Sequence, residues 1–391
     1  MVKSLAVERA GSSAIRDLLE ITERPGIVSL AGGLPNPATF PTEALARASA
    51  AALAEDPLTA LQYGPTEGYR PLRRWVAERH GLGAHGTEGE ERVLVTSGSQ
   101  QALELLTRAL VDPGGQVALA DPAYVGALQA FRAAGVELAA IPADADGLCV
   151  DVLADRLACG ERPALVYVVA NFDNPSGSTL SAERRAALAE LADRYGFWIV
   201  DDDPYGELRW NGEAPVALCE LTDRTITLGS TSKVLAPGLR VGWAVAPVEV
   251  RRAMTILKQS ADLHTSALTQ QVVHRTMAEP GFLDAHLATL RTTYQHQAQH
   301  LVGALRDQVG DRLAVVEPDG GMFLWAELLD PTADTAALLA PAVEAGVAFV
   351  PGAAFGVERL HPTRMRLSYA TADAAGLDLA VARLAGVLTG P

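Results

Sequence analysis

Short apolar segments alternate with longer amphipathic segments through the middle of the chain. The apolar segments are rich in Val, Ile and Leu, as strands buried on both faces of a sheet are, and the longer segments have helical periodicity. This alternation predicts an α/β fold whose main sheet is mostly parallel. The predicted strands are residues 93–96, 116–120, 136–141, 164–170, 197–201, 225–228 and 241–246, and the clearest predicted helices are 100–111, 124–134 and 182–195.

One connection departs from this alternation. Residues 229–240, between the last two predicted strands, are mostly turn and polar residues. A parallel pair needs a crossover of about a dozen or more residues, usually a helix, and no helix fits comfortably here. We therefore expect this pair to be antiparallel, in a sheet of seven strands with one reversed.

The two ends of the chain predict a second, smaller α+β domain. The first 45 residues hold one helix and a Gly/Pro-rich loop, too little to fold alone, so they must dock on another part. The large domain is predicted at 46–284, and the small domain combines 1–45 with 285–391. The terminal elements expected are a helix at 13–22, a loop at 31–37, a helix at 281–309, a hairpin of 313–316 and 322–327, a helix at 335–345, strands at 347–350 and 365–370, and a last helix.

Composition narrows the class of protein. The chain has 391 residues, of which 49% are hydrophobic, and a net charge of −15, which argues against nucleic acid and anionic membranes as partners. No apolar run is long enough to span a bilayer, and no secretory leader is visible. The three cysteines lack CxxC spacing, which favours free thiols in a reducing compartment. We therefore expect a cytoplasmic protein.

The segment 229–240 carries the most specific chemistry. Lys233 stands between the hydroxyls of Ser230 and Ser232 and the guanidinium of Arg240. A lysine forms an imine with an aldehyde, and the hydroxyls and the arginine can bind a phosphate. Pyridoxal phosphate (PLP) carries both groups, although a single lysine in a loop is more often a surface residue.

Polar residues follow other predicted strands, where ligands of open α/β sheets bind. Gly98, Ser99 and Gln100 open a helix, which suits a phosphate, and Ser99 could equally be a plain N-cap. Tyr124 could stack on a heterocycle or simply pack. Asn174 could donate to a phenolate oxygen, or belong only to a turn.

Asp201, Asp202 and Asp203 end the strand at 197–201. Metal binding is one interpretation, but no further ligand with suitable spacing follows, so we expect no metal. A single carboxylate facing a pyridinium nitrogen is a better use, because it keeps the ring a strong electron sink. The other two acids are then expected to be solvated.

Together these residues resemble the class I and II aminotransferases, PLP enzymes of fold type I, over nearly the whole chain. Within that family the resemblance is to the branch of 2-aminoadipate and kynurenine-type multi-substrate aminotransferases. The segments that carry the resemblance are 29–35, 62–68, 174–177, 202–205, 230–240 and 320–325.

The resemblance implies roles for the cofactor site. Lys233 is implied to hold PLP as an imine and to shuttle the substrate proton, with Asp202 at the pyridine nitrogen. Tyr205 and Asn174 are implied to hold the ring oxygen, and Tyr124 to stack on the ring. The residues implied to surround the phosphate are Gly98, Ser99, Gln100, Ser230, Ser232 and Arg240.

The resemblance also implies a substrate site. Arg366 would clamp the α-carboxylate, favoured over Arg364 on the same strand face because it directly precedes Leu-Ser-Tyr. Gly33 and Asn174 would also contact the substrate. Arg16, on a helix that acts as a lid, would meet a side-chain carboxylate, unless it is simply a solvated helix residue.

Tyr63 is implied to reach the phosphate of a neighbouring subunit, which predicts a homodimer with shared sites. Two positions depart mildly from the family pattern. Ser176 stands for the usual threonine, and Asp173 stands where a neutral residue is expected. The extra charge of Asp173 could alter substrate preference.

The predicted function is a PLP-dependent aminotransferase with a ping-pong mechanism. It would move an amino group from an L-amino acid of the 2-aminoadipate, aromatic or branched-chain type to a 2-oxo acid, with 2-oxoglutarate expected. One alternative is another PLP enzyme of the same fold, such as a decarboxylase, cyclase or oxidase. The other is a non-catalytic, aminotransferase-like regulatory protein, which the acidic composition and the absence of a winged-helix segment disfavour.

Overall fold

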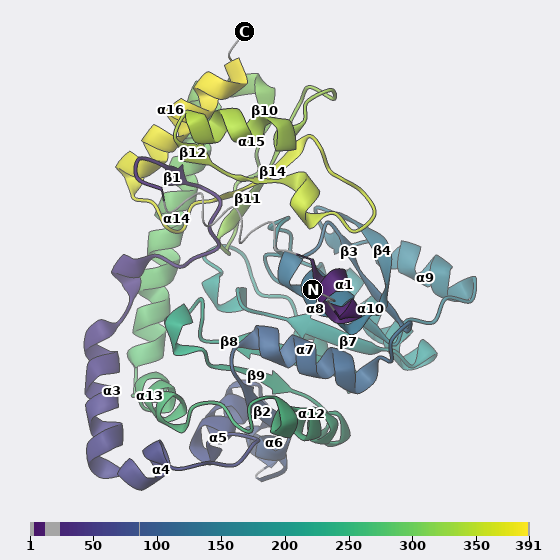
Figure 1. Cartoon of the computed structure of the whole chain (residues 1–391), viewed down its shortest axis with the longest axis vertical. Coiled ribbons are helices and arrows are strands. Elements are labelled where there is room, and N and C mark those ends of the chain that lie inside the picture. The colour runs from purple at the N-terminus through teal and green to yellow at the C-terminus, as the bar shows by residue number, and fades with distance from the viewer. Residues whose placement is uncertain (1–3, 12–23, 86, 390–391) are drawn as a thin grey trace.

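The computed structural model describes residues 4–11, 24–85 and 87–389 (Figure 1). The helix predicted at 13–22 and its Arg16 lie outside these residues. The described residues before it contain a short helix that the sequence did not predict, α1 (Leu5–Ala10), which packs on α8 (Val125–Ala134). None of the described helices is long and apolar enough to cross a membrane.

The large sheet lies in the middle of the molecule and contains all seven predicted strands, most of them shifted by one or a few residues at their ends. Within the described residues it has eight strands rather than seven, because a two-residue strand forms a hairpin with β4. Two residues are too few to show periodicity, so this strand gave no signal. In spatial order the strands are β2 (Val93–Thr96), β9 (Gly242–Val245), β8 (Thr225–Ser230), β7 (Trp198–Asp202), β6 (Leu165–Val168), β3 (Gln116–Asp121), β4 (Glu137–Asp144) and β5 (Gly147–Leu148).

The predicted strand reversal is confirmed, because β9 pairs antiparallel with both β8 and β2. The strands β8, β7, β6, β3 and β4 pair in parallel. The reversal also affects the edge of the sheet at which the parallel strands end. The carboxyl end of β8 and the beginning of β9 meet at the same edge, so Lys233 and Arg240 are held close to the ends of the parallel strands.

Alternate residues of the strands pack into two separate cores, as the two-residue period requires. On β6, Leu165 and Tyr167 belong to a core with residues of α7 and α8, whereas Val166 and Val168 pack with residues of α9 and α10. Helices therefore cover both faces of the sheet (Figure 1). The helices of this part are α3 (Thr42–Glu55), α4 (Pro57–Leu61), α5 (Arg70–Arg79), α6 (Thr87–Glu91), α7 (Ser99–Leu110), α8, α9 (Val150–Ala158), α10 (Ala182–Tyr195), α11 (Leu218–Leu221), α12 (Val248–Ala261) and α13 (Ala267–Met277).

A smaller α+β layer lies above the sheet in Figure 1, and α14 (Phe282–Gln308) runs between the two parts. The single strand predicted at 347–350 is two strands, because the chain passes from one small sheet to another. One sheet pairs β1 (Val28–Ser29) in parallel with β12 (Val347–Ala348). The other has the order β10 (Leu313–Ala314), β11 (Phe323–Leu328), β14 (Arg364–Ser368) and β13 (Val350–Pro351), next to α15 (Thr335–Glu344) and α16 (Ala374–Thr389).

The pairing of β1 with β12 confirms that the N-terminal segment docks on another part of the chain. Leu30 extends this contact, since its N–H donates to the Ala348 carbonyl and its own carbonyl accepts from Ser368. The domain boundaries at 46 and 285 stay a prediction. Both fall inside helices, α3 and α14 respectively.

Candidate active site

A cavity of about 430 Å³ lies at the edge where β2, β8, β7 and β6 end, and where the N-terminal loop and β14 approach the sheet. Twelve of the predicted site residues line it. Gly98 and Tyr63 are described but are not among the lining residues, and Arg16 is not described. The predicted lining residues are Gly33, Ser99, Gln100, Tyr124, Asn174, Asp202, Tyr205, Ser230, Ser232, Lys233, Arg240 and Arg366.

Lys233 follows β8 and points its amine across the cavity. Its Nζ donates to the carbonyl oxygen of Gly33, 2.6 Å away, so the N-terminal loop closes over the lysine. Burial, followed by the positive charges of Arg366 and Arg240, lowers the Lys233 pKa to about 8. The neutral amine is therefore accessible near physiological pH, as a nucleophile requires.

Asp202 ends β7 beneath the cavity and is buried. The hydroxyl of Tyr167 donates to its Oδ2 at 2.9 Å, and its Oδ1 has no hydrogen-bond partner among the described residues. Burial raises the Asp202 pKa to about 7, although the Tyr167 hydrogen bond opposes the rise. A cationic N–H donor facing Oδ1 would satisfy this oxygen and favour the charged carboxylate.

Of the two neighbouring acids, Asp201 is buried, contrary to the expectation that it is solvated, and Asp203 is partly exposed. Because β7 extends through Asp202, the side chain of Asp201 points to the opposite face of the sheet, where it is buried. Asp203 accepts hydrogen bonds from the Gly206 N–H and from Asn171. Within the described ranges, no three His, Cys, Asp or Glu side chains are grouped so that they could hold a metal ion.

Arg366 lies on β14 and is fully buried. Its Nη1 donates to Asn174 Oδ1 at 2.8 Å, and its Nη2 donates to the Ala31 carbonyl at 2.6 Å. The rings of Phe323 and Phe355 flank the guanidinium, with centroids 4.3 and 5.1 Å from its carbon. Burial lowers the Arg366 pKa to about 10, so the group remains charged and would gain from a carboxylate partner.

The choice between the two arginines of β14 now has a physical basis. Arg364 forms an ion pair with Glu327, 2.6 Å away, and both side chains are partly exposed. Glu327 is its cross-strand partner on β11, so the pair is satisfied locally. Of the two, only Arg366 lines the cavity.

The beginning of α7 forms an anion site beside Arg240. Gly98 has a φ of +86° and is the N-cap, so Ser99 is the first helical residue rather than the N-cap suggested by the sequence. A side chain at position 98 would collide with the Arg240 guanidinium. Arg240 Nη2 donates to the Ser97 carbonyl at 3.1 Å, and the hydroxyls of Ser230 and Ser232 lie 2.9 Å apart. Free N–H groups, hydroxyls and a guanidinium thus converge.

Aromatic side chains form the remaining walls. Tyr124 is the N-cap of α8, and burial raises its pKa to about 12. Tyr205 is buried near Asp202, packs edge-on against Phe323 with ring centroids 5.8 Å apart, and also has a raised pKa because of burial. Both tyrosines are therefore neutral hydrogen-bond donors at physiological pH.

Several contributing groups were not assigned a role from the sequence. They are the Tyr167 hydroxyl, the Ala31 carbonyl and the ring of Phe355. Tyr167 lies in a predicted strand, where a tyrosine is most simply explained as a core residue. Phe355 is 11 residues before Arg366 in the chain and contacts it only in the folded structure. Phe323 lies in the segment 320–325, which carries the family resemblance, but the sequence indicated no role for this residue. Local sequence carries no signal for such long-range contacts.

Tyr63 lies outside the cavity of its own chain, and its side chain is 79% exposed. Its ring meets the ring of His264 edge-on, with centroids 5.8 Å apart. The structure places it on the surface and gives it no partner within the cavity. A role toward a neighbouring subunit would use this exposed position.

The functional groups that line the cavity fit one class of enzyme. An amine with a lowered pKa, an anion site at a helix start and a buried carboxylate with an unpartnered oxygen line one cavity, together with Tyr124. These groups suit the aldehyde, the phosphate, the ring nitrogen and the ring face of PLP. The fold and the site thus define a PLP-dependent enzyme of fold type I.

Comparison with known proteins agrees with this class. The sequence profile of the family "Aminotransferase class I and II" matches residues 26–384. The chain is 42% identical to a 2-aminoadipate transaminase of Thermus thermophilus, covering 98% of this chain and 95% of that protein. It is 39% identical to an aromatic-amino-acid aminotransferase of Thermococcus litoralis, covering 92% of this chain and 87% of the other.

A solved structure extends the comparison to three dimensions. The α-aminoadipate aminotransferase of Thermus thermophilus, complexed with N-(5'-phosphopyridoxyl)-L-leucine, matches with a TM-score of 0.91 at 40% identity, covering 99% of this chain and 97% of that chain. The protein belongs to the class I and II aminotransferases. It is a PLP-dependent aminotransferase.

Proposed function

We propose that this enzyme transfers the amino group of an apolar, aromatic or 2-aminoadipate-type L-amino acid to 2-oxoglutarate. The observation that carries the proposal is that Lys233 and Arg366 line the same cavity. Asn174, which accepts a hydrogen bond from Arg366, lines it as well. An α-amino acid needs an amine-handling group and a carboxylate clamp at close range. The names of the relatives support this range of donors.

We assign the cofactor contacts as follows. PLP supplies an electrophilic aldehyde and an electron sink when bound. Lys233 would hold the cofactor through its Nζ and would carry the α-proton at the same atom, and Asp202 would favour a protonated ring nitrogen. Tyr205 and Asn174 would hold the ring oxygen, and Tyr124 would stack on the ring. Gly98, Ser99, Gln100, Ser230, Ser232 and Arg240 bind the phosphate.

The substrate side of the cavity indicates which donors fit. We propose that Arg366 binds the α-carboxylate and that Gly33 and Asn174 border the substrate. The described lining residues without a cofactor or carboxylate role are apolar apart from one amide, which favours apolar and aromatic side chains. They are Leu34, Val125, Gly126, Gln129, Val169, Pro204, Pro237 and Phe323. Arg16 would be needed for an acidic side chain.

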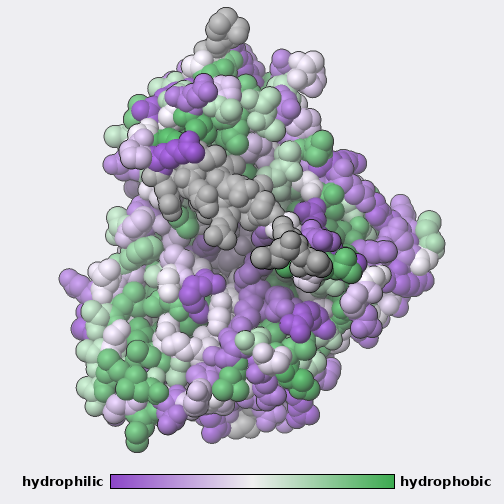
Figure 2. Space-filling view, in the orientation of Figure 1, coloured by the Kyte–Doolittle hydropathy of each residue, from purple (hydrophilic) through white to green (hydrophobic). Residues whose placement is uncertain are grey.

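We further propose a homodimer in which Tyr63 reaches the phosphate of the neighbouring subunit. Hydrophobic residues gather over α3, α4 and α13, at the lower left of Figure 2. Leu58 and Leu61 on α4 are 82% and 70% exposed, next to the exposed Tyr63. An apolar surface of this kind favours burial against a partner. Sedimentation analysis of the holoenzyme tests the assembly.

A donor panel tests the proposed function. Aromatic and branched-chain amino acids are expected to convert 2-oxoglutarate to glutamate with accumulation of the matching oxo acid. The Arg16→Ala variant should lose activity selectively with 2-aminoadipate and glutamate; an equal loss with all donors would reject Arg16 as a specificity residue. Consumption of a donor without an equivalent of acceptor would indicate another PLP reaction.

Arg366→Lys is expected to raise KM for every amino donor and to lower kcat/KM by about 10²-fold, since lysine cannot replace a bidentate, charge-assisted contact. The cofactor spectrum of this variant should stay unchanged. Arg364→Lys is the matched control on the same strand, and its kcat/KM should stay within about two-fold because its partner is Glu327. Equal losses in both variants would contradict the assignment of the α-carboxylate to Arg366.

The rate at which PLP attaches to the apo-protein is expected to rise with pH and to level off above about 8. The aldehyde reacts with the neutral amine, and burial lowers the Lys233 pKa from 10.5 to about 8, so the neutral form predominates above that pH. Stopped-flow absorbance measures the profile. Nα-acetyl-lysine is the control, and its rate should keep rising to about pH 10. A protein profile that followed the control would show an unperturbed amine.

A further inference from the structure

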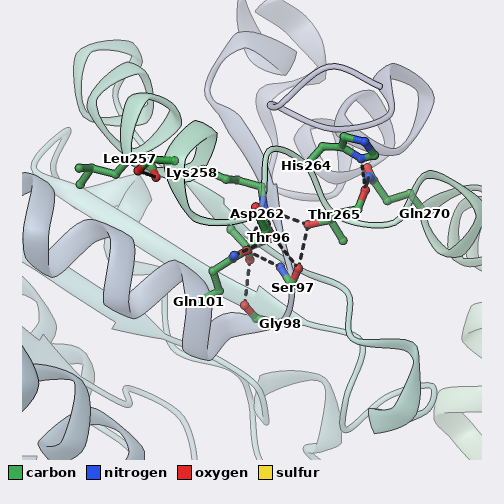
Figure 3. A network of polar contacts seen from close by, with 11 residues as sticks. Thr96, Ser97, Gly98, Gln101, Leu257, Lys258, Asp262, His264, Thr265 and Gln270 are labelled. Atoms are coloured by element: carbon green, nitrogen blue, oxygen red, sulfur yellow. Dashed lines mark hydrogen bonds and ion pairs between the residues drawn. The ribbon is translucent and has the colours of Figure 1, made fainter. Parts of the chain in front are cut away.

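A closed network of polar side chains lies behind the loop that begins α7 (Figure 3). Its centre is Lys258 on α12, which is fully buried although it carries a charge. The Lys258 ammonium donates to Gln101 Oε1 at 2.8 Å, to both oxygens of Asp262 at 2.9 Å and to Thr265 Oγ1 at 3.1 Å. The cavity described above is lined by other residues.

The network holds the loop from its rear side. Asp262 Oδ2 accepts from the Ser97 hydroxyl at 3.0 Å and from the Gln101 amide at 2.8 Å. Gln101 Oε1 in turn accepts from the Ser97 backbone N–H at 2.8 Å. On the other side of the loop, Arg240 donates to the Ser97 carbonyl. Ser97 is thus held through its side chain and both backbone groups, directly before the proposed phosphate contacts.

Burial of the Lys258 ammonium costs free energy, so stabilisation of the fold alone does not explain why a charged residue lies here. Removing the Lys258 ammonium from water costs several kcal/mol, and the side chain of its partner Asp262 is 28% exposed, so solvent weakens the attraction that offsets this cost. What such a pair does provide is a fixed geometry for the groups that it bonds. Here those groups are Ser97 and Gln101, on either side of Gly98, Ser99 and Gln100.

We propose that Lys258 is a positioning residue for phosphate binding: it holds Asp262 and Gln101 so that Gly98, Ser99 and Gln100, at the start of α7, present their N–H groups to the cofactor phosphate. The pair also sets the charge behind the loop. Lys258 neutralises the Asp262 carboxylate, which would otherwise repel a phosphate dianion. The proposal rests on the phosphate contacts assigned under the proposed function.

The test compares PLP with pyridoxal, which has the aldehyde and the ring but no phosphate. Lys258→Met is expected to raise the Kd of the apo-protein for PLP by about ten-fold or more and the Kd for pyridoxal by less than about three-fold. Absorbance titration gives both constants. A variant that was merely less stable would weaken both ligands alike, so the ratio of the two constants isolates the phosphate.

Two further variants keep the test decisive if Lys258→Met folds poorly. Asp262→Ala removes the acceptor that holds Ser97 and Gln101, so positioning predicts weaker PLP binding, whereas a purely electrostatic effect predicts tighter binding. Arg251→Met is the matched control, since Arg251 is also buried on α12 but donates to the Glu91 carbonyl. Its two constants should not change.

The outcomes distinguish failure of the positioning role of Lys258 from failure of the assigned phosphate contacts. An unchanged ratio of PLP to pyridoxal affinity in Lys258→Met, or tighter PLP binding in Asp262→Ala, overturns the positioning role. Failure of the parent protein to bind PLP more tightly than pyridoxal would instead remove the assigned phosphate contacts. We expect the ratio of PLP to pyridoxal affinity to fall in Lys258→Met and in Asp262→Ala, and to stay unchanged in Arg251→Met.

Discussion

Lys233→Ala is expected to lower turnover of every amino donor by about 10⁴-fold or more, because one side chain supplies both the nucleophilic amine and the proton-transfer base. The geometry that supports this expectation is local. The Lys233 amine lies in the cavity, 2.6 Å from the Gly33 carbonyl, with its pKa lowered to about 8. The sequence has only two other lysines, Lys3 and Lys258, and Lys258 is enclosed by its own acceptors.

Initial rates of oxo-acid formation at saturating PLP measure this loss. Lys233→Arg is the matched control, because it keeps a positive charge of similar length but remains protonated and cannot form an imine. Both variants should therefore be inactive to a similar degree. Activity of the alanine variant above about one per cent of the parent would mean that another group moves the proton, since base catalysis contributes about 10²–10⁴-fold.

Asp202→Asn is expected to lower kcat by about 10³-fold while PLP still attaches to Lys233. The Asp202 carboxylate has one oxygen bonded to Tyr167 and one without a partner in the described structure, where the pyridine nitrogen is proposed to lie. An amide cannot stabilise a protonated ring, so the ring becomes a weaker electron sink. Single-turnover rates, followed by the change in cofactor absorbance, separate this chemical loss from binding.

The same substitution is expected to stabilise the apo-protein at alkaline pH. Burial raises the Asp202 pKa from 3.8 to about 7, so the folded apo-protein holds this proton more tightly than the unfolded chain. The contribution of Asp202 to stability is therefore present at low pH and is lost as the pH rises toward 7 and above. Asparagine removes that loss, so thermal unfolding should show an advantage for the variant that grows from about pH 4 to about pH 7 and then stays constant.

Asp201→Asn provides the matched control for the effect on kcat. Asp201 is equally buried on the same strand, with a pKa also raised to about 7 by burial, but it points to the opposite face of the sheet. Its kcat should stay within about three-fold of the parent, because no contact reaches the cavity. A large fall in kcat for Asp201→Asn, or none for Asp202→Asn, would contradict the assignment of the ring nitrogen to Asp202.

The main sheet could be predicted from the sequence because its strands are continuous apolar runs. The reversal of β9 was also predictable, since residues 229–240 are too short and too irregular for a crossover helix. The β5 hairpin was missed because two residues have no period. The split of β12 from β13 was missed because the change of sheet occurs at Phe349, inside one apolar run.

The cavity could be predicted where a side chain follows a strand directly. Asp202 ends β7, and Lys233 and Asn174 follow β8 and β6, so the topology brings the three residues to one edge. Groups from the C-terminal part of the chain could be identified only by resemblance, as Arg366 was, or not at all, as with Phe355. The network around Lys258 was not predicted either, because the sequence alone does not distinguish Lys258 from an exposed helix lysine.

Mapping the cofactor attachment tests the central claim most directly. The holoenzyme is reduced with sodium borohydride, digested and analysed by mass spectrometry for the phosphopyridoxyl group. Because the sequence has only Lys3, Lys233 and Lys258 as lysine candidates, the result is unambiguous. The account predicts one adduct per chain, on the peptide that contains Lys233. An adduct on Lys258 or Lys3, or a reduced protein without any adduct, would contradict it.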